Sequence, residues 1–421
     1  MNNLPKEWKE LSLEDICITK GIRRGPFGGA LKKDIFVPNG YKVYEQKNAI
    51  SKDLSLGQYF ITEEKYNEME AFQVKENDFL ISCSGTIGKI VQISNNYKKG
   101  IINQALLKLT LNNFVINDTF FKYQFESDKI QSLIVDNTQG GAMANLVGMS
   151  IFKNIKFIIP PIKEQKQIAE ILSTVDNKIE NLKENVNVTE ELKKGLIQKL
   201  FTEGICHTEF KDSEFGKIPK SWEEISLEDI CITKGIRRGP FGGALKKDIF
   251  VPNGYKVYEQ KNAISKDLSL GQYFITEEKY NEMEAFQVKE NDFLISCSGT
   301  IGKIVQISNN YKKGIINQAL LKLTLNNFVI NDTFFKYQFE SDKIQSLIVD
   351  NTQGGAMANL VGMSIFKNIK FIIPPIKEQK QIAEILSTVD NKIENLKENV
   401  NVTEELKKGL IQKLLTGEVR V

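Results

Sequence analysis

The chain has 421 residues, a formal net charge of +3, and 41% hydrophobic and 26% charged residues, proportions typical of a globular protein. Five cysteines and one histidine exclude a disulfide framework and a zinc site with the usual Cys and His spacing. The sequence lacks a signal peptide pattern and any apolar run near the ~20 residues of a membrane helix. We therefore expect a cytoplasmic protein that does not contact membranes. Because the charge is nearly balanced, any nucleic-acid surface must be local.

An internal duplication is the most informative feature of the sequence. Residues Ser12–Leu200 recur without a change as Ser226–Leu414, at a constant offset of 214 positions. A unit of this length indicates a duplicated domain rather than a solenoid, whose repeats span roughly 20–50 residues. Identical sequences fold identically, so whatever one half binds, the other half binds too. If the halves pack about a two-fold axis, the combined site is symmetric.

Each copy begins with a region of mixed secondary structure. Short apolar runs bounded by Gly, Asn and Asp predict strands, while longer mixed stretches predict helices. Strands are expected at Phe79–Ser82, Lys89–Ile93, Ala105–Leu111 and Ile155–Ile159, and helices at Glu63–Met69 and Asp118–Val135. This is the pattern of an α+β domain of roughly 150 residues.

After Pro160-Pro161 the sequence becomes charged and periodic. Apolar residues at 4-3-4-3-4 spacing predict a coiled-coil seam. The seam residues are Ile168, Leu172, Val175, Ile179, Leu182 and Val186 in the first copy, and Ile382, Leu386, Val389, Ile393, Leu396 and Val400 in the second. A helix over residues 163–200 would be about 57 Å long. Its natural partner is its own duplicate; the alternative is a lone amphipathic helix lying on its own domain.

These patterns divide the chain into five segments. The expected bounds are 1–160 for the first globular domain, 161–203 for the first long helix, 204–217 for a linker, 218–374 for the second globular domain, and 375–421 for the second helix with the C-terminal tail. The linker is polar and is expected to be a loop. The predicted fold class is α+β, with two duplicated domains separated and followed by long helices that pair as an antiparallel coiled coil with pseudo-two-fold symmetry.

Several motifs, in this order, resemble those of the specificity (S) subunit of Type I DNA restriction-modification enzymes. They include Pro5-Lys6-Glu7-Trp8, Gly25-Pro26-Phe27-Gly28-Gly29, Ser84-Gly85-Thr86-Ile87-Gly88-Lys89 and the helix entry Ile159–Ala169, and the resemblance covers nearly the whole chain. It implies that each globular domain is a target recognition domain that reads half of a split double-stranded DNA target. It also implies that the helices set the spacing and dock two methyltransferase subunits.

The resemblance assigns chemistry to partners rather than to this chain. The methyltransferase subunits would bind S-adenosylmethionine and methylate adenine, and restriction subunits would use ATP and magnesium to translocate and cut DNA. No cofactor, metal or catalytic residue is expected here. Family members usually carry two different recognition domains, whereas two identical domains predict an interrupted palindrome. Readers one DNA turn apart with short half-sites would leave a spacer of roughly 6–7 bp.

DNA reading requires cations for phosphates and planar amides or guanidinium groups for base edges. The candidates are Arg23, Arg24, Lys32, Lys33, Gln46, Lys47, Asn48, Ser84, Thr86, Lys89, Gln139 and Asn145, and in the second copy Arg237, Arg238, Lys246, Lys247, Gln260, Lys261, Asn262, Ser298, Thr300, Lys303, Gln353 and Asn359. The two arginines suit a guanine contact, a phosphate contact or a plain solvated face. Residues 84–89 suit either a phosphate contact or a structural turn. Phe27 is expected to anchor its loop in the core rather than to wedge between bases.

Two other functions fit parts of the sequence. Asp34 followed by Glu45-Gln46-Lys47 is similar to the acidic pattern of metal-dependent nucleases, although Glu-Gln-Lys recurs at 164–166 within a helix start. A coiled-coil scaffold that binds protein would explain the helices but not the basic and amide-bearing loops. The glycine-rich segments at 25–32 and 85–89 do not match a phosphate-binding loop.

Overall fold

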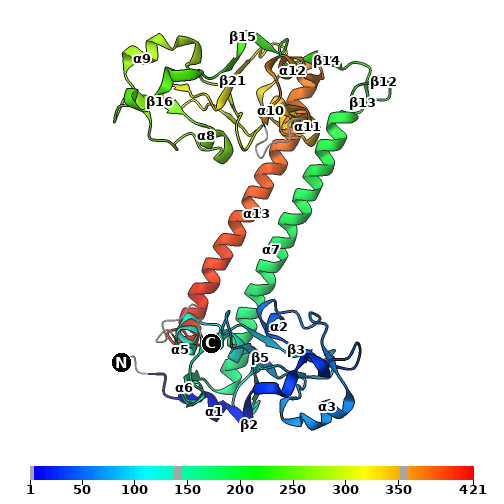
Figure 1. Cartoon of the computed structure of the whole chain (residues 1–421), viewed down its shortest axis with the longest axis vertical. Helices are drawn as coiled ribbons and strands as arrows, with labels where there is room; N and C mark the ends of the chain where they lie inside the picture. Colours follow the sequence, from blue (N-terminus) through cyan, green and yellow to red (C-terminus); the bar gives the residue numbers. More distant parts are fainter. Residues whose placement is uncertain (1–3, 137–144, 351–358) are drawn as a thin grey trace. The chain divides into compact units, whose positions relative to one another are not determined.

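The computed structural model describes residues 4–136, 145–350 and 359–421 (Figure 1). The chain divides into two compact units, Met1–Lys183 with Glu398–Val421, and Glu184–Lys397. Each unit holds one globular domain, the beginning of the long helix that follows this domain, and the end of the other long helix.

The two globular domains have the same order of helices and strands, except that residues 227–230 of the second form a turn where the first has helix α1. The first contains β1 (Lys9–Ser12), α1 (Leu13–Ile16), β2 (Cys17–Arg24), β3 (Tyr41–Tyr44), α2 (Gln46–Ile50), β4 (Phe60–Ile61), α3 (Glu63–Glu68), β5 (Phe79–Ser82), β6 (Ile90–Gln92), β7 (Gly100–Ile102), β8 (Leu106–Leu111), α4 (Asp118–Phe125), α5 (Asp128–Ile134), β9 (Val135–Asp136), β10 (Asn145–Leu146), α6 (Met149–Asn154) and β11 (Lys156–Ile159). The second contains β14 (Glu223–Ser226), β15 (Cys231–Arg238), β16 (Tyr255–Tyr258), α8 (Gln260–Ser265), β17 (Phe274–Ile275), α9 (Glu277–Glu282), β18 (Phe293–Ser296), β19 (Ile304–Gln306), β20 (Gly314–Ile316), β21 (Leu320–Leu325), α10 (Asp332–Phe339), α11 (Asp342–Ile348), β22 (Val349–Asp350), β23 (Asn359–Leu360), α12 (Met363–Asn368) and β24 (Lys370–Ile373).

Two sheets form the centre of each domain. In the first copy, one is antiparallel with the order β2-β8-β5-β6, and the other has the order β4-β3-β7 with β3 and β7 parallel. The central strand β5 is buried on both faces. Phe79 and Ile81 pack into the main core with Phe120 and Phe121 of α4, while Leu80 packs on the other side with residues next to the second sheet. This alternation follows from the two-residue period of a strand.

Two predicted elements differ from the observed ones. The single helix expected over Asp118–Val135 is broken into α4 and α5, because the backbone of Ser127 is extended, with φ −66° and ψ 146°, and its hydroxyl donates back to the Gln124 carbonyl over 2.6 Å. The linker expected to be a loop contains a β-hairpin, β12 (Phe210–Ser213) with β13 (Gly216–Pro219). Gly216 provides the positive φ of +92° that the tight connection requires.

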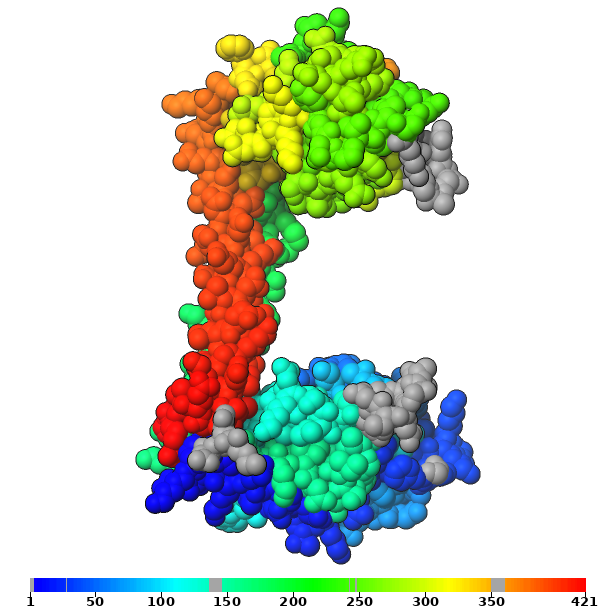
Figure 2. All heavy atoms as spheres, turned by 90° about the vertical axis from the view of Figure 1, so that its left-hand side faces the viewer, coloured from blue at the N-terminus to red at the C-terminus, as the bar shows by residue number. Residues whose placement is uncertain are grey.

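The long helices are α7 (Ile162–Thr202) and α13 (Ile376–Thr416). Helix α7 begins immediately after Pro161, whose carbonyl accepts a hydrogen bond from the Gln165 amide over 3.0 Å. In the first unit Ile168 and Leu172 are fully buried in the core of the domain, together with Leu414 and Leu415 of α13. Figure 2 shows this end of α13, in red, against the first domain. Each long helix therefore begins on the domain that precedes it, as the lone-helix alternative expected. Each domain also binds the end of the other long helix.

Ion pairs show how the helices pair within each unit. In the first unit Asp176 binds Lys407 and Lys183 binds Glu404, each over 2.6 Å. In the second unit Glu190 binds Lys397 and Lys193 binds Asp390, also over 2.6 Å. Partner numbers fall on α13 as they rise on α7, so the predicted antiparallel pairing is confirmed.

The seam residues beyond the domain cores are buried or half-buried. Ile179, Val186, Ile393, Leu396 and Val400 are buried, and Val175, Leu182 and Val389 are half-buried. Among the residues that the structure describes, no helix is long and apolar enough to cross a membrane, and this includes α7 and α13.

Candidate nucleic-acid interface

The polar candidates gather at one end of the central sheets, which we call the loop end. Strands β2 and β5 both run antiparallel to β8, so their last residues meet its first: Arg24 pairs with Leu107 and Ser82 with Leu106. The parallel strands β3 and β7 end nearby, since the Asn103 amide donates to the Tyr44 carbonyl over 3.0 Å. The loop end is thus formed by 23–33, 45–48, 83–89 and 103–105.

The two arginines lie at the end of β2. Arg23 is opposite Lys108 of β8, and both arginine side chains are half-buried. The guanidinium carbon of Arg24 lies 5.3 Å from the centre of the Phe27 ring, a cation–π contact. Phe27 itself is 69% exposed, so its prediction as a core anchor is wrong. Lys32 lies between the two following short 3-10 helices and Lys33 begins the second, and both residues are exposed.

The segment after β3 contains three candidates: Lys47 is exposed, Gln46 is half-buried and Asn48 is buried. Asn48 is fully buried: its side-chain oxygen accepts from the Glu45 amide over 2.8 Å, and its NH₂ donates to the carbonyls of Asp53 and Leu56. The predicted base contact is therefore wrong for Asn48, which caps α2. Lys47 is exposed and paired with Glu45 over 2.8 Å. The side-chain oxygen of Gln46 is buried without a hydrogen-bond partner among the described residues.

The contacts of the Glu45 carboxylate do not favour the nuclease alternative, because they are made within its own segment. It caps α2 and pairs with Lys47, while Asp34 lies exposed in a 3-10 helix. Within the described ranges no group of three or more His, Cys, Asp or Glu residues could hold a metal ion. Glu45 is accounted for by local structure.

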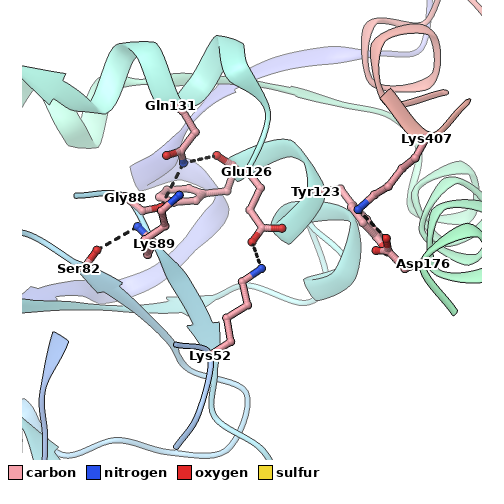
Figure 3. A network of polar contacts seen from close by, with 10 residues as sticks. Lys52, Ser82, Gly88, Lys89, Tyr123, Glu126, Gln131, Asp176 and Lys407 are labelled. Atoms are coloured by element: carbon pink, nitrogen blue, oxygen red, sulfur yellow. Dashed lines mark hydrogen bonds and ion pairs between the residues drawn. The ribbon is translucent and has the colours of Figure 1, made fainter. Parts of the chain in front are cut away.

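Hydrogen bonds from Ser82 and from Gln131 of α5 hold the loop between β5 and β6 (Figure 3). The Ser82 hydroxyl donates to the Thr86 carbonyl over 2.6 Å and accepts from the Lys89 amide over 3.0 Å. Gln131 of α5 donates to the Gly88 carbonyl over 3.2 Å. These bonds make the backbone a structural turn. The side chains of Thr86 and Lys89 remain exposed and Ser84 is half-buried, so a phosphate contact stays compatible with the turn.

A buried ion pair lies beside Arg23. Lys108 is 3.8 Å from Asp78, whose other oxygen accepts from the Thr110 hydroxyl over 2.5 Å. Burial raises the pKa of the Asp78 carboxyl and lowers the pKa of the Lys108 amine. Burial also raises the pKa of Cys83, at the base of the loop, to about 12, so it is no nucleophile. The loop end therefore offers hydrogen bonds and charge rather than covalent chemistry.

Both copies of the repeated sequence match a known protein family. Residues 5–191 and again 219–405 match the family described as the Type I restriction modification DNA specificity domain. The chain belongs to this family. Specificity subunits are the non-catalytic DNA-recognition components of Type I systems, so the loop ends are surfaces of a DNA-recognition protein.

Relatives of this specificity subunit match along most of their length. It is 30% identical over 363 residues to the Type I restriction enzyme MjaVIII specificity subunit of Methanocaldococcus jannaschii, covering 83% of this chain and 80% of that protein. It is 26% identical to the putative MjaX specificity subunit of the same organism, covering 100% and 96%. The HsdS subunit from Thermoanaerobacter tengcongensis has a TM-score of 0.56 at 14% identity, covering 99% and 98% of the two chains. At that identity the likeness shows a shared fold.

The second recognition domain of the specificity subunit repeats the loop end. Arg238 lies 5.5 Å from the ring centre of Phe241, Lys261 pairs with Glu259 over 2.8 Å, and Asn262 is fully buried. Arg237 is half-buried on β15; Lys246, Thr300 and Lys303 are exposed; Ser298 is half-buried; and the Gln260 oxygen is buried without a partner among the described residues. Asn262 is therefore a helix cap like Asn48, and its predicted base contact is wrong for the same reason.

Some candidates fall outside the described parts of the specificity subunit. These are Gln139 and Gln353, and the side chains of Asn145, Asn359 and Lys247. The structure adds one residue that the sequence analysis missed, Gln104. It is exposed on the turn that joins β7 to β8, next to Gly25, the residue that follows Arg24. The sequence signal that could have identified Gln104 is its amide side chain in a short turn between two apolar strands.

Proposed function

We propose that the two recognition domains read the two half-sites of an interrupted palindrome in double-stranded DNA. The observation that carries the proposal is that identical candidate readers occupy the same loop end in both copies. Identical domains related by a two-fold axis prefer a symmetric target. With centres one turn, ~10.5 bp, apart and half-sites of about 3–4 bp, the spacer is roughly 6–7 bp.

The long helices serve as the spacer and as the docking surface for two methyltransferase subunits. The antiparallel ion pairs in each unit support this role, because a helix of fixed length sets a fixed separation. S-adenosylmethionine would be used by these subunits, and ATP and magnesium by the restriction subunits that join them in the cytoplasm. This chain supplies recognition: cations position the phosphates, and Arg23, Arg24, Gln46 and Gln104 are the groups that suit base edges.

The test is modified-base sequencing of DNA from cells that express this chain with its methyltransferase subunit. We expect methyl-adenine in an interrupted palindrome. An asymmetric methylated motif would contradict the palindromic target, but it would still support a role of this chain in DNA recognition. An assembled complex that adds no methylation would contradict the proposal and favour a protein-binding scaffold.

A further inference from the structure

Each recognition domain exposes one aromatic ring at its loop end. Phe27 is 69% exposed and Phe241 is 71% exposed. A single exposed ring is common on a protein surface, so its exposure alone assigns it no role. The neighbour of this ring is what distinguishes it. In each copy the ring faces an arginine guanidinium, Arg24 at 5.3 Å and Arg238 at 5.5 Å.

The backbone beside Phe27 is fixed in place. The Gly25 amide donates to the Leu106 carbonyl over 2.9 Å, which adds one bond to the β2–β8 ladder. A Cβ atom at Gly25 would lie 1.8 Å from the Asn103 carbonyl oxygen, so only glycine fits there. Pro26 is buried and has a fixed φ. The ring is therefore held on a rigid support directly after the strand that carries the arginine.

The Arg24 guanidinium is held by packing. Its Nε atom is buried without a hydrogen-bond partner, and within the described ranges no carboxylate lies close enough to form a salt bridge with it. The positive charge is thus not neutralised by a neighbour, and the guanidinium carbon lies over the Phe27 ring, 5.3 Å from its centre. A guanidinium held in one plane keeps its terminal nitrogens free for a bidentate contact, for which guanine offers two acceptors.

We propose that Phe27 and Phe241 are specificity-determining positioning residues. Each ring holds its arginine flat, so that Arg24 and Arg238 read one guanine in each half-site. This inference rests on the proposed function, since it assumes that the loop ends face DNA. Without the ring, the long arginine side chain samples several rotamers and reaches phosphates as readily as base edges.

The chain offers a matched control in another exposed phenylalanine. Phe114 and Phe328 are each 97% exposed. Phe114 follows the last residue of β8, whereas the loop end lies at its first residue. Removing these rings tests the loss of an exposed aromatic residue away from the candidate interface.

The experiment measures methylation rates of the assembled complex on its target and on duplexes that carry each single base-pair change. The variants are F27A/F241A, F27W/F241W, R24K/R238K and F114A/F328A. We expect F27A/F241A to lower discrimination about tenfold at one base pair per half-site, the size of a lost cation–π constraint. R24K/R238K should affect the same base pair, since lysine cannot make the bidentate contact. The tryptophan variant should retain discrimination, and F114A/F328A should behave as the parent.

Three outcomes would overturn the inference. These are an equal loss of rate on all duplexes in F27A/F241A, a change at a different base pair from R24K/R238K, and unaltered discrimination. In each of them the parent complex still methylates a defined motif, so the proposed function stands. A parent complex without sequence-specific methylation would overturn both.

Discussion

Trp8 donates from its indole Nε1 to the carboxylate of Glu164 over 3.0 Å, across 156 residues of sequence. Arg420 completes the contact, with Nε 3.1 Å from one carboxylate oxygen and Nη2 2.9 Å from the other. Glu378 repeats the first bond with Trp222 over 2.9 Å, but its other partners are His207 and the Ile205 amide. In the first unit the Glu164 carboxylate, at the start of α7, thus joins the N-terminal segment to the C-terminal tail.

Arg420→Ala should destabilise the first unit in a pH-dependent way. The hydrogen bond from Arg420 is the main cause that lowers the pKa of Glu164 below its ordinary 4.5. A lowered folded-state pKa contributes stability that is present above the unfolded pKa and lost as the pH falls through the folded one. We expect a lower Tm for the variant at pH 7, and a difference from the parent that shrinks below pH 4.5. Thermal unfolding across pH measures it; a difference that stays constant down to pH 3 would contradict it.

Tyr123→Phe should weaken the junction of α4, α7 and α13 (Figure 3). The Tyr123 hydroxyl donates to Asp176 over 2.7 Å, and Lys407 binds the other oxygen of Asp176 over 2.6 Å. Removing a hydrogen bond to a charged group should lower the free energy of unfolding by about 1.5 kcal/mol. Chemical denaturation measures the change.

The second copy offers an internal check on this estimate. Tyr337 donates to Asp390 over 2.7 Å, and Lys193 binds Asp390. Tyr337→Phe should therefore cost a similar amount, and the double variant the sum, because the two junctions share no partner. A neutral effect in both copies would mean that these bonds do not stabilise the helix pairing.

Cysteine reactivity should distinguish the linker from the domains. Burial raises the pKa of Cys17, Cys83 and Cys231 to about 12 and that of Cys297 to about 11, whereas Cys206 is exposed. Because the thiolate is the nucleophile, a maleimide should add once per folded chain, at Cys206. Mass spectrometry of the intact protein measures it. Cys206→Ser should abolish the addition, and a second fast addition in the parent would contradict the buried cores.

The elements predicted well from the sequence are those whose signal is local. The strand Phe79–Ser82 has its predicted bounds, and α7 extends over 162–202 against an expected 163–200, because a diproline and an apolar period define it. Asn48 and Phe27 were assigned incorrectly for a common reason. Burial depends on which strands lie beside a residue, and the loop end is assembled from segments distant in sequence. Residue type alone did not distinguish the enclosed amide from the exposed ring.

Deleting one helical turn should test the role of α7 as a spacer. Residues 185–188 lie between the two groups of ion pairs, Lys183 with Glu404 and Lys193 with Asp390. Their removal shortens α7 by about 6 Å, so both groups cannot remain in register with an unchanged α13. We expect the variant to lose its methylation motif or to change the length of the spacer, as modified-base sequencing would reveal.

A paired deletion is the control for this experiment. Removing residues 399–402 from α13 as well shortens both helices equally and lets the antiparallel pairs form again. Since ~6 Å corresponds to about 2 bp at 3.4 Å per base pair, the double deletion should restore methylation at a target with a spacer about 2 bp shorter. If the single-deletion and double-deletion complexes both methylate the parental motif with an unchanged spacer, the helices do not set the distance between the half-sites.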